Sequence, residues 1–124
     1  MKIRFFICNH CGNIIAMVRD NGIPVYCCGE KMEEIIPGAS DGAQEKHSPV
    51  YNVNGETVTV SVGAAEHPMT PDHYIEWVCI ESSEGLQFKK LSPNASPRVS
   101  FSLSKNEKVI AVYAFCNLHS LWKS

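Results

Sequence analysis

Four cysteines near the start of the chain constrain its fold more than any other feature. Four of the six cysteines in the sequence fall within the first 28 residues, at positions 8, 11, 27 and 28. The strands predicted around them are short and bury little apolar surface: Ile3–Ile7, Ile14–Val18 and Ile23–Tyr26. Residues 1–36 therefore need a cross-link. A metal held by the four thiolates would supply it and would couple folding to metal binding.

The cysteines fall into two pairs with different spacing. Cys8 and Cys11 form a CxxC knuckle followed by Gly12, in which one tight turn aims two thiolates at one point. Gly12 tolerates the backbone conformation that amide-to-sulfur hydrogen bonds require. Cys27 and Cys28 are adjacent, and adjacent side chains on a strand point to opposite faces. Both can reach one metal only if the chain turns sharply there, which the following glycine permits.

The adjacent pair also bears on which metal is bound. An ordinary zinc ribbon has two CxxC pairs, so the pair Cys27-Cys28 argues mildly against a plain structural zinc. A structural zinc and a pair of disulfides nevertheless stay open as alternatives on spacing alone. His10 lies inside the knuckle, but four thiolates already fill a tetrahedral site, so we interpret His10 as an exposed bystander.

Charge and hydropathy indicate where such a chain would work. The net charge of −2 over 124 residues gives no basic footprint for nucleic acid or an anionic membrane surface. The apolar run Phe5-Phe6-Ile7 is too short for the core of a signal peptide, and no run is long enough to cross a bilayer. We therefore expect a cytoplasmic protein, and a reducing cytosol favours metal ligation over disulfides.

A second domain is expected after a turn-rich linker. Pro37–Gly42 is rich in turn residues and marks the boundary, with residues 37–44 as the linker. Residues 45–124 predict an antiparallel β-sandwich of short strands with no amphipathic helix of useful length. The predicted strands are Tyr51–Val53 and Glu56–Val62, joined at the hairpin signal Asn54-Gly55, then His73–Glu81, Gln87–Leu91, Val99–Leu103 and Lys108–Cys116.

A second set of metal-binding side chains lies in this domain. Cys116 and His119 follow the apolar run Val109–Phe115, which predicts a buried central strand. Three further histidines lie in loops or at strand ends, where side chains can converge on one point of a rigid scaffold: His47, His67 and His73. Four imidazoles and one thiolate are an unusual set for zinc, which prefers four ligands. Five such ligands with a sixth position open suit iron.

The motifs that contain these residues resemble those of a known family. Four segments resemble the superoxide reductase signature in the same order: Glu45-Lys46-His47, His67-Pro68-Met69, His73-x-Ile75-Glu76-Trp77 and Cys116-Asn117-Leu118-His119-x-Leu121-Trp122. The N-terminal cysteine motifs resemble the desulforedoxin module. The combination resembles the desulfoferrodoxin family of two-iron superoxide reductases over nearly the whole chain. Ser120 and Tyr74 depart from the residues that the family commonly has, and neither is a ligand position.

The resemblance implies two irons per chain and an activity. One iron would be held as Fe(Cys)4 by Cys8, Cys11, Cys27 and Cys28. The catalytic iron would be held as Fe(His)4(Cys), by a square of His47, His67, His73 and His119 with Cys116 as axial ligand. The second domain would be an immunoglobulin-like sandwich. The reaction would be one-electron reduction of superoxide to hydrogen peroxide without release of dioxygen, detoxifying superoxide in an anaerobe or microaerophile.

The resemblance also implies roles for the residues beside the ligands and for partners. Lys46 would attract the superoxide anion and hold a proton-donating water, and Glu45 would occupy the open iron position in the ferric resting state. A rubredoxin-like protein would donate electrons, and the chain would form a homodimer. Two other functions stay open: an electron carrier that uses only the Fe(Cys)4 centre, and a zinc-stapled binding domain without redox activity. Cys79 is expected to be a buried inert thiol.

Overall fold

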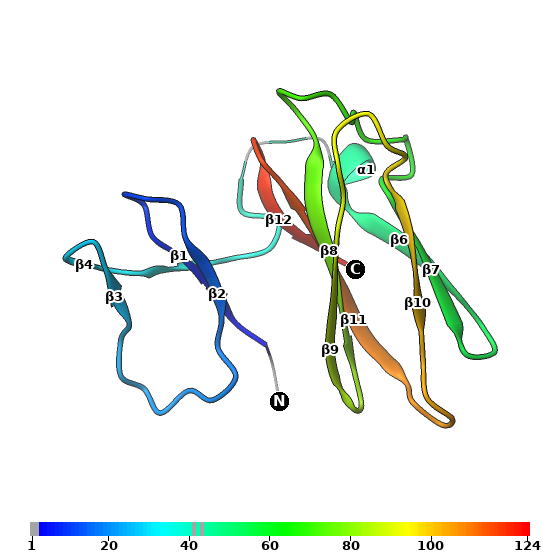
Figure 1. Cartoon of the computed structure of the whole chain (residues 1–124), viewed down its shortest axis with the longest axis horizontal. Coiled ribbons are helices and arrows are strands. Elements are labelled where there is room, and N and C mark those ends of the chain that lie inside the picture. The colour runs from blue at the N-terminus through cyan, green and yellow to red at the C-terminus, as the bar shows by residue number, and fades with distance from the viewer. Residues whose placement is uncertain (1–2, 41, 43) are drawn as a thin grey trace. The chain divides into compact units, whose positions relative to one another are not determined.

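The computed structural model describes residues 3–40, 42 and 44–124, and of Glu45 it describes the backbone alone. The chain divides into two compact units, the first ending at Ile36 and the second beginning at Pro37. Apart from the four-residue helix α1 (Gln44–His47), the regular structure of the described residues is β (Figure 1). The predicted all-β fold class is therefore confirmed. No helix in these ranges is long and apolar enough to span a membrane.

The first unit contains a three-stranded antiparallel sheet and a separate short hairpin. In the sheet, β1 (Phe5–Ile7) lies between β2 (Ile14–Ala16) and β5 (Glu33–Ile35). The hairpin is formed by β3 (Tyr26–Cys27) and β4 (Glu30–Lys31). Each of these strands has only two or three residues, as expected for a unit with little apolar surface to bury.

The third strand of that sheet is not the segment predicted from the sequence. Ile23–Tyr26 was predicted as the third strand of residues 1–36, but of this segment Tyr26 alone lies in a strand, β3, and β5 completes the sheet by pairing Ile35 with Phe5. Pro24 cannot donate a ladder hydrogen bond, and the Ile23 side chain is 72% exposed. Ile35 is buried instead, so the pairing of β5 with β1 gains apolar burial that the earlier segment could not supply.

The second unit contains two antiparallel sheets that face each other. One sheet has the order β10-β7-β6, with bounds Arg98–Ser102, Thr57–Val62 and Pro49–Asn54. The other has the order β12-β11-β8-β9, with bounds Ser120–Lys123, Val109–Cys116, Ile75–Ser82 and Gly85–Lys90. The antiparallel sandwich predicted from the strand pattern is confirmed, and β12 is an additional strand. β12 was missed because four residues carry too weak a pattern to predict a strand.

The β6–β7 hairpin sets which residues of β7 face the core. Asn54 pairs with Thr57, so the two-residue loop is Gly55-Glu56, one residue later than the sequence signal suggested. Gly55 takes a φ of 62° at the first loop position, a conformation that glycine adopts without steric cost. With this register, alternate residues of β7 point inward, and they are the three predicted valines Val58, Val60 and Val62.

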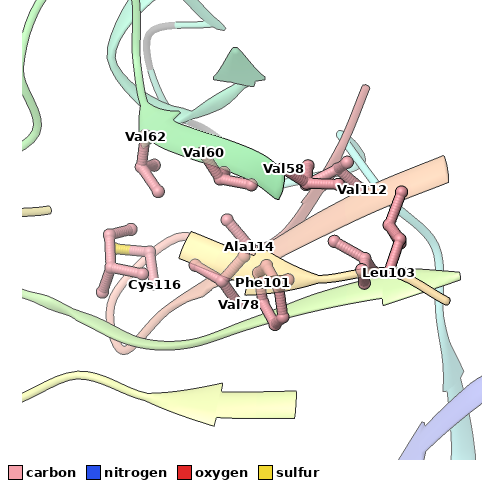
Figure 2. Packing of buried hydrophobic residues seen from close by; sticks show 11 residues of the cluster. Val58, Val60, Val62, Val78, Phe101, Leu103, Val112, Ala114 and Cys116 are labelled. Atoms are coloured by element: carbon pink, nitrogen blue, oxygen red, sulfur yellow. The ribbon is translucent and has the colours of Figure 1, made fainter. Parts of the chain in front are cut away.

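The core lies between the two sheets (Figure 2). It combines the valines of β7 with residues of β8, β10, β11 and the segment after β10. Its members are Val58, Val60, Val62, Ile75, Val78, Ile80, Phe101, Leu103, Val112, Ala114 and Cys116. Cys116 is the last residue of β11 and is fully buried. One predicted metal ligand is therefore held by the hydrophobic core itself.

Candidate metal centres

The four cysteines of the first unit come together in one group. Their sulfur atoms all lie within 4.8 Å of one another, and the Sγ atoms of Cys11 and Cys27 are 3.7 Å apart. A tetrahedral metal with bonds of about 2.3 Å to sulfur places its ligand atoms about 3.8 Å apart. The spacing of this four-cysteine group (Cys8, Cys11, Cys27, Cys28) therefore fits a tetrahedral metal.

The CxxC knuckle aims backbone amides at its sulfurs. The N–H of Cys11 donates to the Cys8 Sγ at 3.4 Å, and the N–H of Asn13 donates to the Cys11 Sγ at 3.5 Å. Gly12 closes the turn with a φ of 85° and donates its N–H to the Cys8 carbonyl. The Cys11 amide is the main reason that the pKa of the Cys8 thiol falls to about 6. This half of the group therefore favours the thiolate form that binds metal. His10 is exposed.

The adjacent cysteines occupy a tight hairpin turn. Cys27 pairs with Glu30, so Cys28 and Gly29 form the two-residue loop between β3 and β4. Their φ angles are 54° and 77°, and two positive values are the signature of a type I′ turn. The sharp turn predicted from the sequence is present, and it involves Cys28 itself as well as Gly29. Cys28 thereby reaches the same group as Cys27, which resolves the difficulty of two neighbouring ligands on a strand.

The second group draws its side chains from separate parts of the second unit. His47 ends α1, His67 lies in the loop after β7, and His73 precedes β8. Cys116 ends β11, and His119 lies in the turn between β11 and β12. The described structure brings all five together, and we name them the histidine–cysteine group. His47 and His67 are almost completely buried.

The four imidazole rings form a quadrilateral. Successive ring centroids are 4.6 Å apart for His47–His67, 4.7 Å for His67–His73, 5.1 Å for His73–His119 and 4.8 Å for His119–His47. The diagonal from His47 to His73 is longer, at 6.2 Å. Ligand atoms of His47, His67, His73 and Cys116 lie within 4.8 Å of one another. The Nδ1 of His119 is 3.0 Å from His47 Nε2 and 3.9 Å from Cys116 Sγ.

The protonation and hydrogen bonding of the histidines fit a metal. Nε2 of His67 and Nε2 of His73 are buried and have no hydrogen-bond partner in the part of the chain that the structure describes. Leaving such atoms unpaired is costly, and a metal would pair both. The Nδ1 of His67 lies 2.6 Å from the Pro68 carbonyl, the backbone bond that metal-ligating histidines usually make. Burial lowers the pKa of His67 to about 4, so the ring is neutral near pH 7.

Close packing around His47 and His119 helps to hold the group. The Trp122 ring stacks on His47 with centroids 4.9 Å apart, and its Nε1 donates to the His119 carbonyl at 2.9 Å. The Ser40 hydroxyl donates to the same carbonyl. A Cβ added at Gly42 would lie 3.1 Å from Trp122, 3.2 Å from His47 and 3.3 Å from His119. The segment predicted as a linker therefore packs against the ligands.

Sequence reasoning missed these packing roles. Trp122 lies within the motif that contains Cys116 and His119, so the sequence indicated that it belongs near the site. Nothing in the motif specifies that its ring stacks on a residue 75 positions earlier (122 − 47). Gly42 gave a turn signal only.

The structure also places the other residues singled out in the sequence. Lys46 is exposed and precedes His47, and the side chain of Glu45 lies outside what the structure describes. Cys79 is buried as predicted, and burial raises its pKa to about 12.

The family model for desulfoferrodoxin matches residues 39–124. Desulfoferrodoxin of Clostridium acetobutylicum is 41% identical over 122 residues, which cover 98% of this chain and 95% of that protein. Desulfoferrodoxin of Nitratidesulfovibrio vulgaris is 42% identical over 124 residues, which cover 99% and 96%. The chain belongs to the desulfoferrodoxin family. The resemblance found in the sequence motifs is therefore confirmed.

Solved structures extend the comparison. The superoxide reductase from Treponema pallidum matches with a TM-score of 0.84 and 39% identity, covering 100% of this chain and 99% of that one. A superoxide reductase (1Fe-SOR) from Giardia intestinalis matches with a TM-score of 0.56 and 31% identity, covering 64% of this chain and 95% of that one. The four-cysteine group and the histidine–cysteine group match the two iron sites expected of a desulfoferrodoxin.

Proposed function

We propose that this chain is a superoxide reductase that reduces superoxide to hydrogen peroxide without releasing dioxygen. The observation that carries the proposal is the convergence of four imidazoles and one thiolate in the histidine–cysteine group. Its family and its likeness to solved superoxide reductases from two organisms support the same activity. The residue assignments are His47, His67, His73, Cys116 and His119 for the catalytic iron, and Cys8, Cys11, Cys27 and Cys28 for the second iron.

The donor set determines the chemistry of the site. Ferrous iron bound there would supply one electron, which together with two protons converts superoxide to hydrogen peroxide. Neutral imidazoles add no negative charge, and the lowered pKa values of His67 and His73 keep these two rings neutral. The Cys116 thiolate is the one anionic donor among the five, so the site retains positive charge that attracts a small anion. Burial raises the pKa of the Cys116 thiol, and the N–H groups of Leu118 and His119 oppose part of that effect.

Lys46 is positioned to influence the approach of the anion. It is exposed, and its neighbour His47 is buried within the group. Burial is the main cause that lowers the pKa of His73, the neighbouring histidines come next, and the positive charge of Lys46 adds a smaller contribution in the same direction. We assign Lys46 to attracting superoxide and to holding a water that delivers protons. Glu45, the preceding residue, is assigned as the carboxylate that occupies the open iron position in the resting ferric state.

Metal analysis of the anaerobically purified chain, combined with pulse-radiolysis kinetics, tests this function. Two irons per chain and rapid consumption of superoxide with peroxide as product are expected. A single iron at the four cysteines would support an electron carrier instead. Zinc alone, with no reaction towards superoxide, would support a binding domain. Either of those results would contradict the proposal.

Substitutions distinguish the proposed roles of Lys46 and Glu45, the two residues that precede His47. Lys46→Ala should slow the second-order capture of superoxide and leave the iron absorption nearly unchanged. Lys105→Ala is the matched control, because it removes the same charge from an exposed loop before β11, at the strand end opposite to Cys116. Glu45→Ala should alter the ferric absorption and hardly affect capture. Equal capture rates in Lys46→Ala and Lys105→Ala would remove the steering role.

The proposal includes the surroundings in which the reductase works. A rubredoxin-like protein is proposed as the electron donor, a homodimer as the assembly, an immunoglobulin-like topology for the sandwich and the cytoplasm as the location. Sedimentation velocity of the metal-loaded chain tests the assembly, and electron transfer from reduced rubredoxin in a stopped-flow mixer tests the donor.

A further inference from the structure

Asn117 bonds to the backbone on both sides of a candidate ligand. It lies directly after Cys116 in the chain. Its Oδ1 accepts a hydrogen bond from the N–H of Tyr74 at 2.9 Å, and its Nδ2 donates to the carbonyl of Asp72 at 3.0 Å. His73 is the residue between those two. One side-chain amide thus holds the peptide groups that flank His73.

The hydrogen bonds between Thr70 and His73 act within the loop that contains His73. Thr70 and His73 form a β-bridge with hydrogen bonds of 3.0 and 3.1 Å, and the Thr70 hydroxyl lies within hydrogen-bond distance of the His73 backbone. These bonds define the shape of the loop. They do not connect it to β11, where the thiol ligand is located.

The pairing of β8 with β11 is irregular at the end where the His73 loop meets Cys116. From Ala111 to Phe115, β11 pairs regularly with β8, and Phe115 lies opposite Trp77. Cys116 then lies opposite Ile75, with a register shift between these two pairs. The N–H of Asn117 donates to the Tyr74 carbonyl at 3.2 Å. Asn117 therefore makes three bonds to residues 72 and 74, at the point where the regular pairing of the two strands is interrupted.

The chemistry of the side chain is specific to an amide. The contact needs one acceptor for the Tyr74 amide and one donor for the Asp72 carbonyl at the same time. An asparagine side chain supplies both, whereas an ionised aspartate only accepts and an alanine does neither. This requirement distinguishes a positioning role from simple filling of space.

We infer that Asn117 is a positioning residue that fixes His73 relative to Cys116 in the histidine–cysteine group. The inference rests on the proposed function only in taking that group as the metal site. Asn117 does not bind the metal. It sets the distance between one imidazole and the thiolate through the backbone of the loop that contains His73.

Cobalt binding to the full-length chain tests the inference without relying on turnover. Co²⁺ at the histidine–cysteine group should give a thiolate-to-metal absorption band. Asn117→Ala should weaken Co²⁺ binding there by about tenfold, the lower end of the usual effect of residues that orient ligands, and should shift the band. Asn117→Asp keeps the acceptor and loses the donor, so it should fall between Asn117→Ala and wild type. Asn52→Ala, on exposed β6, is the matched control and should bind as wild type does.

A double-mutant cycle tests whether Asn117 affects Co²⁺ affinity through His73. If Asn117 acts through His73, Asn117→Ala should add little to the loss of affinity in a His73→Ala background. In a His67→Ala background it should again cost about tenfold. Urea denaturation of each variant reports whether the sandwich of the second unit is folded, because the four-cysteine group lies in the first unit and reports on that unit alone.

Two results would overturn the inference. One is a wild-type Co²⁺ affinity and band in Asn117→Ala. The other is a loss of equal size in the His73→Ala and His67→Ala backgrounds, which would show a general structural effect. Failure of the proposed function is distinguishable, because a wild-type chain that binds metal in the group without reducing superoxide would contradict that function and leave the role of Asn117 intact.

Discussion

The two units hold their candidate metals in opposite ways. In the first unit, the buried apolar residues in the described range are few: Ile3, Phe5, Cys8, Met32 and Ile35, and Cys8 is itself a candidate ligand. Large apolar side chains such as Val18 and Ile23 remain 81% and 72% exposed. The second unit has a contiguous core built from both of its sheets. We therefore expect the first unit to depend on its metal to fold, and the second to depend on its fold to form a metal site.

The distribution of ligands along the chain follows the same division. The four cysteines come from two tight turns that lie between residues 8 and 29. The ligands of the histidine–cysteine group come from a helix end, two loops and the end of a core strand, between residues 47 and 119. Local turns can bind metal before tertiary structure forms. Ligands this far apart in sequence come together only after the sandwich has folded.

Removing metal should produce the largest difference between the two units, which is measured as the protection of their amides from hydrogen exchange. Without metal at the four-cysteine group, the amides of β1, β2 and β5 should lose protection from hydrogen exchange, because metal binding drives the folding of such small domains, by roughly 10–16 kcal/mol for zinc in zinc-finger peptides. The amides of β7, β8 and β11 should keep theirs. Mass spectrometry of Cys8→Ser, with His67→Ala as the control that disables the other group, would check this. Protected β1 amides in Cys8→Ser would contradict the division.

Damage to the core should have the next largest effect, and in the second unit alone. Phe101→Ala removes a side chain that is only 1% exposed and should cost about 3–5 kcal/mol of unfolding free energy, measured by urea denaturation. Phe88→Ala, at a position 49% exposed, is the size-matched control and should cost less. Metal binding at the four cysteines should not change. Equal losses in the two variants would argue against a core of this composition.

A methyl group added at Gly42 should have a smaller and more local effect. Its Cβ would lie 3.1–3.3 Å from Trp122, His47 and His119, so these side chains must move by a few tenths of an ångström. Overpacking of this kind costs about 1–3 kcal/mol. Gly42→Ala should therefore weaken Co²⁺ binding to the histidine–cysteine group and leave the four-cysteine group unchanged. An unaltered cobalt spectrum would show that the segment does not support the ligands.

The smallest effect concerns the redox properties of the first centre. Asn13 donates from Nδ2 to the Cys27 sulfur at 3.7 Å, which stabilises the more electron-rich reduced state. Asn13→Ala should lower the reduction potential without loss of metal, as potentiometric titration would show. Asn9→Ala is the control from the same turn, because Asn9 donates to the Glu33 carboxylate and not to a sulfur. A potential unchanged from that control would rule out the role of Asn13.

The sequence predicted best those features that depend on short-range geometry. The turn at the adjacent cysteines and the inward face of β7 depend on a few neighbouring residues, and both are present. The all-β class followed from alternation and turn signals. Short strands such as β5 and β12 were missed, because their few residues carry no clear pattern and pairing with a neighbouring strand decides their structure.

Contacts between distant segments lay beyond the sequence pattern. Spacing cannot show that four separate histidines converge, and the grouping came from the family resemblance. The stack of Trp122 on His47 and the bonds of Asn117 depend on how loops meet after the sheets have packed. The close approach of Gly42 to Trp122, His47 and His119 is of the same kind, because a glycine in a turn-rich segment predicts a turn and does not predict tight packing.

The hairpin turn at Cys28 and Gly29 has a consequence for the order in which the two metals can be acquired. It completes the four-cysteine group before any residue of the second unit has been synthesised, so the first centre can take up metal while translation continues. The second centre has to wait for His119. During that interval a cell short of iron can supply one centre and not the other. Metal scarcity should therefore produce chains with a filled first centre and an empty second one more often than the reverse.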